Sequence, residues 1–169
     1  SAASRADFLA LVENPNPDWI MRARYAFKWE GGQTESREKI VLPESRTYLA
    51  ILAAAVSGVP ADAALLSDIA WERVRDPNKL VRPALALGGI SAEVASVAVR
   101  AHATDVRAVV ANASPYTVIS PSLLLVATRF SGEPVAAWEH VGTIASGGEI
   151  TSERRFLRSL PSSLEVAVY

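Results

Sequence analysis

The sequence contains no cysteine among its 169 residues and only two histidines, His102 and His140. The lack of cysteine excludes disulfide frameworks, cysteine zinc sites, thiol catalysis and iron–sulfur ligation. A zinc or iron site would need three or four ligands, and no metal-ligand spacing joins the two histidines to the scattered carboxylates. We therefore expect no metal and no cofactor.

Long apolar runs are also missing. The longest, residues 48–56, ends at Ser57 and Gly58, whereas a membrane helix needs about 20 apolar residues. We expect no membrane partner, and the first residues show no signal-peptide pattern. Half of the residues are hydrophobic and the net charge is -1, a composition that favours folding over disorder. The length predicts a single domain over residues 1–169.

Recognisable catalytic motifs are absent. No serine lies in a Gly-x-Ser-x-Gly pattern, so serine hydrolase chemistry of the nucleophile-elbow type has no support. Three glycine pairs occur at residues 31–32, 88–89 and 147–148, but none belongs to a phosphate-binding fingerprint. We interpret the pairs as turns and expect no catalytic residues and no enzyme activity.

Most apolar residues recur at spacings typical of helices. These spacings predict an α+β fold, mainly helical, in which a helical bundle packs with a small antiparallel sheet. The sheet would contain a β-hairpin over residues 20–42 and a C-terminal strand over residues 164–168. No internal repeat is recognisable at solenoid periods. Helices are expected at residues 4–14, 48–56, 62–75, 91–102, 135–145 and 152–160. Residues 104–112 would continue the helix that begins at residue 91 or start a new one after a kink, and a helix is favoured over a strand at residues 123–127.

The hairpin is the most informative element. Residues 21–29 alternate between apolar and polar side chains, and Gly31-Gly32 would form a two-residue turn. The resulting register pairs Tyr25 with Glu38 and Trp29 with Thr34. Because Tyr25, Phe27 and Trp29 would then face polar partners, we expect them to dock on a second copy of the chain.

Two groups of basic residues are candidates for phosphate or nucleic-acid contacts. The outer face of the hairpin would carry five basic side chains, which could contact phosphates. The more common interpretation of such a pattern is an ordinary half-buried sheet whose outer face is solvated. On the last expected helix, Arg154 and Arg158 lie one turn apart next to Arg155, where Glu149 and Glu153 also stand. The five hairpin cations are Arg22, Arg24, Lys28, Arg37 and Lys39.

Two functions follow from these features. The first is a non-enzymatic structural subunit that assembles with copies of itself, as in a coat or capsid-like shell, and contacts nucleic-acid phosphates through the basic hairpin face. The alternative is a monomeric small-molecule-binding or regulatory domain, or an enzyme without a short motif. Its pocket would lie between helices around His102, Asp105 and Arg107.

Overall fold

The computed structural model describes residues 4–57, 62–75, 89–119 and 122–169. Those residues form strands and turns and contain no helix. The predicted mainly helical α+β fold is therefore wrong, because the segments expected to be helices pair as antiparallel strands. Residues 79–87, for which the sequence predicts no definite element, lie outside the described residues.

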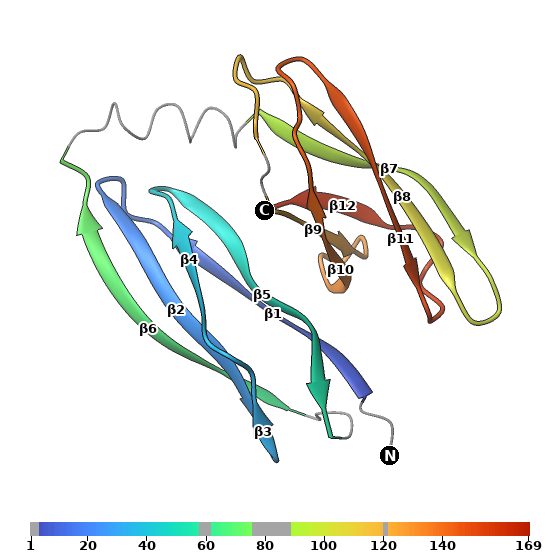
Figure 1. The fold of residues 1–169 in the computed structure, drawn as a ribbon, viewed down its shortest axis with the longest axis horizontal. Helices are drawn as coiled ribbons and strands as arrows, with labels where there is room; N and C mark the ends of the chain where they lie inside the picture. Colours follow the sequence, from blue (N-terminus) through green and yellow to red (C-terminus); the bar gives the residue numbers. More distant parts are fainter. Residues whose placement is uncertain (1–3, 58–61, 76–88, 120–121) are drawn as a thin grey trace. The chain divides into compact units, whose positions relative to one another are not determined.

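The chain divides into two compact units, Ser1–Pro77 and Asn78–Tyr169, where we had expected one domain. Each unit contains two antiparallel sheets (Figure 1). A separate hydrophobic core lies between the two sheets of each unit. Each unit is described separately below.

Unit 1 contains a sheet in which β2 is flanked by β4 and β3 on one side and by β6 on the other, and a second sheet made by β1 and β5. Its core includes Phe8 and Leu49 from the second sheet, with Tyr25 and Phe27 from β2. The strands are β1 (Ser4–Asn14), β2 (Trp19–Trp29), β3 (Gly32–Gln33), β4 (Arg37–Val41), β5 (Ser45–Val56) and β6 (Ala63–Arg73).

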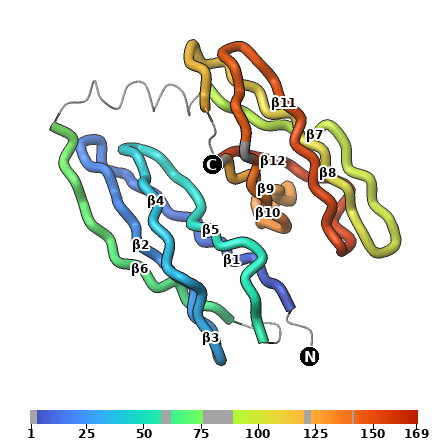
Figure 2. The backbone as a smooth tube through the Cα atoms, in the orientation of Figure 1, coloured from blue at the N-terminus to red at the C-terminus, as the bar shows by residue number. Residues whose placement is uncertain are grey.

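Unit 2 contains the sheets β10-β9-β12 and β11-β8-β7. Trp138 spans the core: its ring contacts Phe156 with centroids 5.9 Å apart, and its Nε1 donates to Ser152 Oγ at 2.9 Å. Figure 2 traces β7 in yellow-green beside β8. The strands are β7 (Ile90–Val99), β8 (Thr104–Asn112), β9 (Ser122–Thr128), β10 (Pro134–Val141), β11 (Glu149–Phe156) and β12 (Glu165–Val168).

The hairpin forms near its expected place, but its register differs from the prediction. The turn is at Glu30 and Gly31, so that Trp29 pairs with Gly32 and Tyr25 pairs with Arg37. Gly31 adopts a φ of 90°, which favours glycine. At the base of the hairpin the shift is one residue, and a one-residue shift moves every side chain of the partner strand to the other face.

The two units share one strand order. In unit 1 the order is β5-β1 opposite β4-β2-β6, and in unit 2 it is β11-β8-β7 opposite β10-β9-β12. β1 therefore corresponds to β8, β2 to β9, β4 to β10, β5 to β11, and β6 to β12. Among the described residues of unit 1, no strand corresponds to β7.

A buried asparagine at the end of β1 and of β8 confirms this correspondence. Asn14 Nδ2 donates to the carbonyl oxygens of Trp19, Val41 and Leu42, and its Oδ1 accepts from the backbone N–H of Asn16. Asn112, 98 positions later, makes the corresponding hydrogen bonds to the backbone of unit 2. Its Nδ2 donates to Tyr116, Ile144 and Ala145, and its Oδ1 accepts from the N–H of Ser114.

Candidate functional site

The predicted basic face of the hairpin is not assembled as expected. Arg22 and Arg24 lie on the outward face of β2, together with carboxylates from the flanking strands. Arg22 Nε is 2.9 Å from Glu72 Oε2, and Arg24 lies directly opposite Glu38 on one side and Asp68 on the other. The open depression on this face, about 450 Å³, therefore has both signs of charge in its lining.

Arg37 and Lys39 are separated from these arginines by the register of the hairpin. They pair with Tyr25 and Ala23, whose side chains face the core, so they share the inward side of the sheet at its β4 edge. Lys39 Nζ donates to the carbonyl of Tyr48 at 3.3 Å. Lys28 remains on the outward face, opposite Ala64 and Gln33.

The aromatic residues expected at an oligomer interface lie in the core of their own unit. Tyr25 and Phe27 are 4% and 3% exposed, and Tyr25 Oη donates to the Ala50 carbonyl of the facing sheet at 3.0 Å. Phe8 of β1 stacks on both Phe27 and Trp29, with centroid distances of 5.3 and 5.1 Å. The sheet formed by β1 and β5 therefore covers these rings. They do not need a second copy of the chain to shield them from water.

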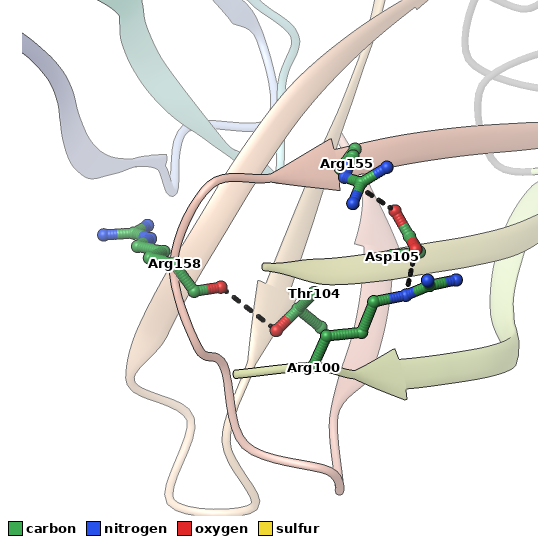
Figure 3. A network of polar contacts seen from close by, with 5 residues as sticks. All are labelled: Arg100, Thr104, Asp105, Arg155 and Arg158. Carbon is green, nitrogen blue, oxygen red and sulfur yellow. Dashed lines mark hydrogen bonds and ion pairs between the residues drawn. The ribbon is translucent and has the colours of Figure 1, made fainter. Parts of the chain in front are cut away.

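The arginines of β11 do not form the expected one-sided cluster. Because β11 is a strand, Arg154 and Arg155 point to opposite faces. Arg155 and Arg100 both approach Asp105, with Nε–Oδ distances of 3.6 and 3.3 Å, while Arg158 lies beyond the strand and accepts a hydrogen bond from Thr104 through its carbonyl (Figure 3).

The alternative pocket around His102 is not enclosed by helices. His102 is exposed in the turn between β7 and β8. Asp105 and Arg107 lie on the outward face of β8, where Arg107 Nε is 3.1 Å from Glu153 Oε1. The depression that contains Asp105 and Arg107, about 430 Å³, does not include His102 in its lining. Among the described residues, no group of three or more histidine, aspartate or glutamate side chains is placed to hold a metal ion.

One edge of unit 1 is left open, and sequence reasoning missed it. β8 pairs with β11 on one side and with β7 on the other. β1 pairs with β5 alone, and no other strand of the described residues pairs with it. We use the term open edge for the free side of β1 together with the inward face of β6.

Corresponding side chains show what the missing strand leaves exposed. Ala108 and Val110, which face inward from β8, are 0% exposed. Their counterparts in β1, Ala10 and Val12, carry the same side chains and are only partly buried. The difference therefore comes from the surroundings of the strand and not from its residue types.

The inward face of β6 is exposed beside this edge. Ile69 and Trp71 pair with the buried Ala23 and Met21 and so lie on the core side of the sheet, yet they are 45% and 44% exposed. In β12, Val166 holds an inward position and is 7% exposed, and β7 lies next to β12 across the sandwich. Adjacent large apolar side chains at this level of exposure are typical of an interaction surface.

The outward face of β1 adds another apolar residue to the open edge. Leu11 is 52% exposed, next to the partly buried Leu9. A strand edge also presents backbone N–H and C=O groups that have no partner strand. Together, these features can bind an extended polypeptide, through backbone hydrogen bonds along β1 and apolar contacts on both sides.

A sequence signal for the open edge was present. β1 and β8 carry identical residues at several counterpart positions, including Asp7 with Asp105 and Asn14 with Asn112. β7 comes immediately before β8 and belongs to the core of unit 2, so the identities between β1 and β8 relate the edge of β1 to the edge of β8 that β7 covers.

The chain matches no protein family model and no curated protein sequence. One solved structure aligned with it is the crystal structure of the Pseudomonas aeruginosa CupB2 chaperone, over 91% of this chain and 92% of that chain. The two share 15% sequence identity with a TM-score of 0.28.

Proposed function

We propose that this protein is a non-enzymatic structural subunit whose unit 1 binds an extended segment of a partner polypeptide along the open edge. The observation that carries the proposal is the difference in exposure between counterpart residues: Ala108 and Val110 are fully buried, whereas Ala10 and Val12 are not. A strand added to β1 would bury the remaining apolar surface and satisfy the free backbone groups of that edge.

This proposal keeps the non-enzymatic structural role expected from the sequence, but it replaces self-assembly through the hairpin aromatics with binding of a partner segment at another surface. The aromatic residues Tyr25 and Phe27 are already buried, so association has to use Ile69, Trp71 and Leu11 instead. Nucleic acid is the less favoured partner, because Glu38, Asp68 and Glu72 share the outward face with its arginines. A net attraction for phosphates needs an excess of positive charge.

Substitutions on the two faces of β6 provide the test. Ile69 faces inward and is 45% exposed, whereas Leu66 of the same strand pairs with Ala26 on the outward side and is 42% exposed. The probe is a fluorescein-labelled decapeptide of alternating threonine and valine flanked by lysines, and its binding is measured by fluorescence anisotropy. We expect Ile69→Glu to weaken binding at least tenfold, because a carboxylate would be buried under the added strand. Leu66→Glu should change it less than twofold.

Equal effects of Ile69→Glu and Leu66→Glu, or no binding of the peptide to the unsubstituted protein, would overturn the proposal. If Ile69→Glu does not fold, Ile69→Thr keeps the branched side chain that suits a strand and should weaken binding several-fold. Sedimentation velocity over a concentration series tests whether the open edge is occupied by a second copy of this chain instead of a separate partner. A doubling of mass that Ile69→Glu abolishes would assign the open edge to a second copy of this chain and exclude a separate partner.

A further inference from the structure

From β7 and its contacts, we infer the direction, register and residue pattern of the strand that the open edge accepts. This inference rests on the proposed function, since it concerns the same edge. In unit 2, β7 runs antiparallel to β8 and its apolar residues pack on the core at alternate positions. The inward residues are Ile90, Ala92, Val94 and, after a bulge, Val97.

The direction of the bound strand follows from the pairing in unit 2. Ile90 pairs with Asn112, and Val99 pairs with Thr104. The counterparts of Asn112 and Thr104 in β1 are Asn14 and Ala6. The N-terminus of the bound segment therefore lies beside Asn14 and its C-terminus lies toward Ala6, antiparallel to β1.

The register follows from side-chain size. In unit 2 a small residue, Ala92, lies opposite Val110, and a larger one, Val94, lies opposite Ala108. β1 repeats the same order, with Val12 and Ala10 at the counterpart positions. The bound strand thus carries a small side chain opposite Val12 and a branched one opposite Ala10, an alternation that fills the space under the strand without a clash.

The outer face of the bound strand distinguishes this site from its counterpart in unit 2. Glu93 pairs with Val109 in unit 2. Leu11, the counterpart of Val109, is 52% exposed and has partly buried Leu9 beside it, where unit 2 has Arg107. An apolar residue at the position of Glu93 therefore fits unit 1 better than glutamate does, because it covers Leu11 without desolvating a charge.

The test uses peptides with the sequence of residues 90–99, labelled with fluorescein and flanked by lysines. The control peptide has the same composition, but its apolar residues are moved to the other face. We expect the β7 peptide to bind at least tenfold more tightly than this control. A third peptide, with valine at the position of Glu93, should bind several-fold more tightly than the β7 peptide.

Orientation is measured by NMR with a spin label on the peptide. A label at the N-terminus should broaden the amide signals near Asn14, and a label at the C-terminus should broaden those near Ala6. The reverse pattern, equal affinity of the β7 peptide and its control, or weaker binding of the valine peptide would overturn the inference. If the threonine-valine probe still binds and responds to Ile69→Glu, the proposed function stands and only the occupant inferred here is wrong.

A variant with its own strand serves as a further control. Replacing residues 1–5 with a second copy of residues 90–103 places β7 and its turn in front of Ala6, as they stand in front of Thr104 in unit 2. Because the open edge would then be occupied within the chain, we expect this variant to lose peptide binding at least tenfold. Undiminished binding would show that the peptide attaches elsewhere and would overturn the assignment to β1.

Discussion

Replacement of Asn14 by alanine should destabilise unit 1 strongly, although Asn14 is a single small polar residue near a turn. Its side chain is fully buried, and its amide group donates to the carbonyls of Trp19, Val41 and Leu42 at 2.7, 3.3 and 3.0 Å. It therefore ties the start of β2 and the end of β4 to the end of β1.

The size of the effect can be worked from these contacts. Asn14 contributes two N–H donors and one acceptor, whose partner is the Asn16 backbone N–H at 3.1 Å. Each buried hydrogen bond contributes roughly 1 kcal/mol, so Asn14→Ala should lower the free energy of unfolding of unit 1 by about 3 kcal/mol. At about 1.4 kcal/mol per factor of ten, this corresponds to roughly 100-fold faster exchange of its best-protected amides.

Amide hydrogen exchange of β1 and β5 measures this effect within unit 1. The matched control is Asn16→Ala, because Asn16 keeps its backbone hydrogen bond and loses only a side-chain contact of 3.4 Å to Asn14 Oδ1. We expect less than a threefold change in the control. An acceleration below about fivefold in Asn14→Ala would refute the view that this side chain holds the strand ends together.

Two further substitutions test the buried hydrogen bonds of unit 2. Thr104→Val removes a hydroxyl that donates to the Arg158 carbonyl and accepts from the Leu160 N–H. It should cost about 2 kcal/mol in urea denaturation, and a cost below about 0.5 kcal/mol would contradict this. Ser152→Ala leaves the buried indole N–H of Trp138 without its 2.9 Å partner. It should cost about 1–3 kcal/mol and change the near-ultraviolet circular dichroism of that indole, and an unchanged spectrum and midpoint would contradict it.

The helical spacings that misled the sequence prediction have a physical origin in β-bulges. In β5, Leu49, Ile51 and Val56 pack in the core, but the register shifts opposite β1 between Ala6 and Phe8, and Ala53 adopts a φ of 55°. The extra residue changes the apolar spacing from two to three, which resembles the period of a helix. A bulge between Val94 and Ser96 changes the spacing of β7 in the same way.

The apolar residues of β6 gave a false helical signal for another reason. Leu65 and Leu66 lie on opposite faces of the strand, as do Ile69 and Ala70. An ordinary half-buried strand would have polar residues on one face. Their spacing matches one face of a helix, whereas in the folded unit only Leu65 and Ile69 lie on the inward face that belongs to the open edge.

Parts of the fold were predictable where the residues alternate without interruption. A strand was expected over residues 21–29, and β2 covers Trp19–Trp29. The end of the chain was also expected to form a strand, and β12 covers Glu165–Val168. The exact position of the turn could not be predicted, because Gly31 and Gly32 can both adopt the positive φ that such a turn requires. In the structure, a Cβ on Gly32 would lie 2.6 Å from Cζ2 of Trp29, so Gly32 serves close packing instead.

The charges on the outward sheet faces determine how strongly this molecule attracts or repels others at long range. Arg107 lies beside Glu153 on unit 2, and Arg22 lies beside Glu72 on unit 1. Opposite charges spaced more closely than the Debye length, about 10 Å at 0.1 M salt, cancel before their field reaches far into solvent. Collisions of these faces with other molecules are therefore neither steered nor repelled at long range, and their association rates should depend little on ionic strength.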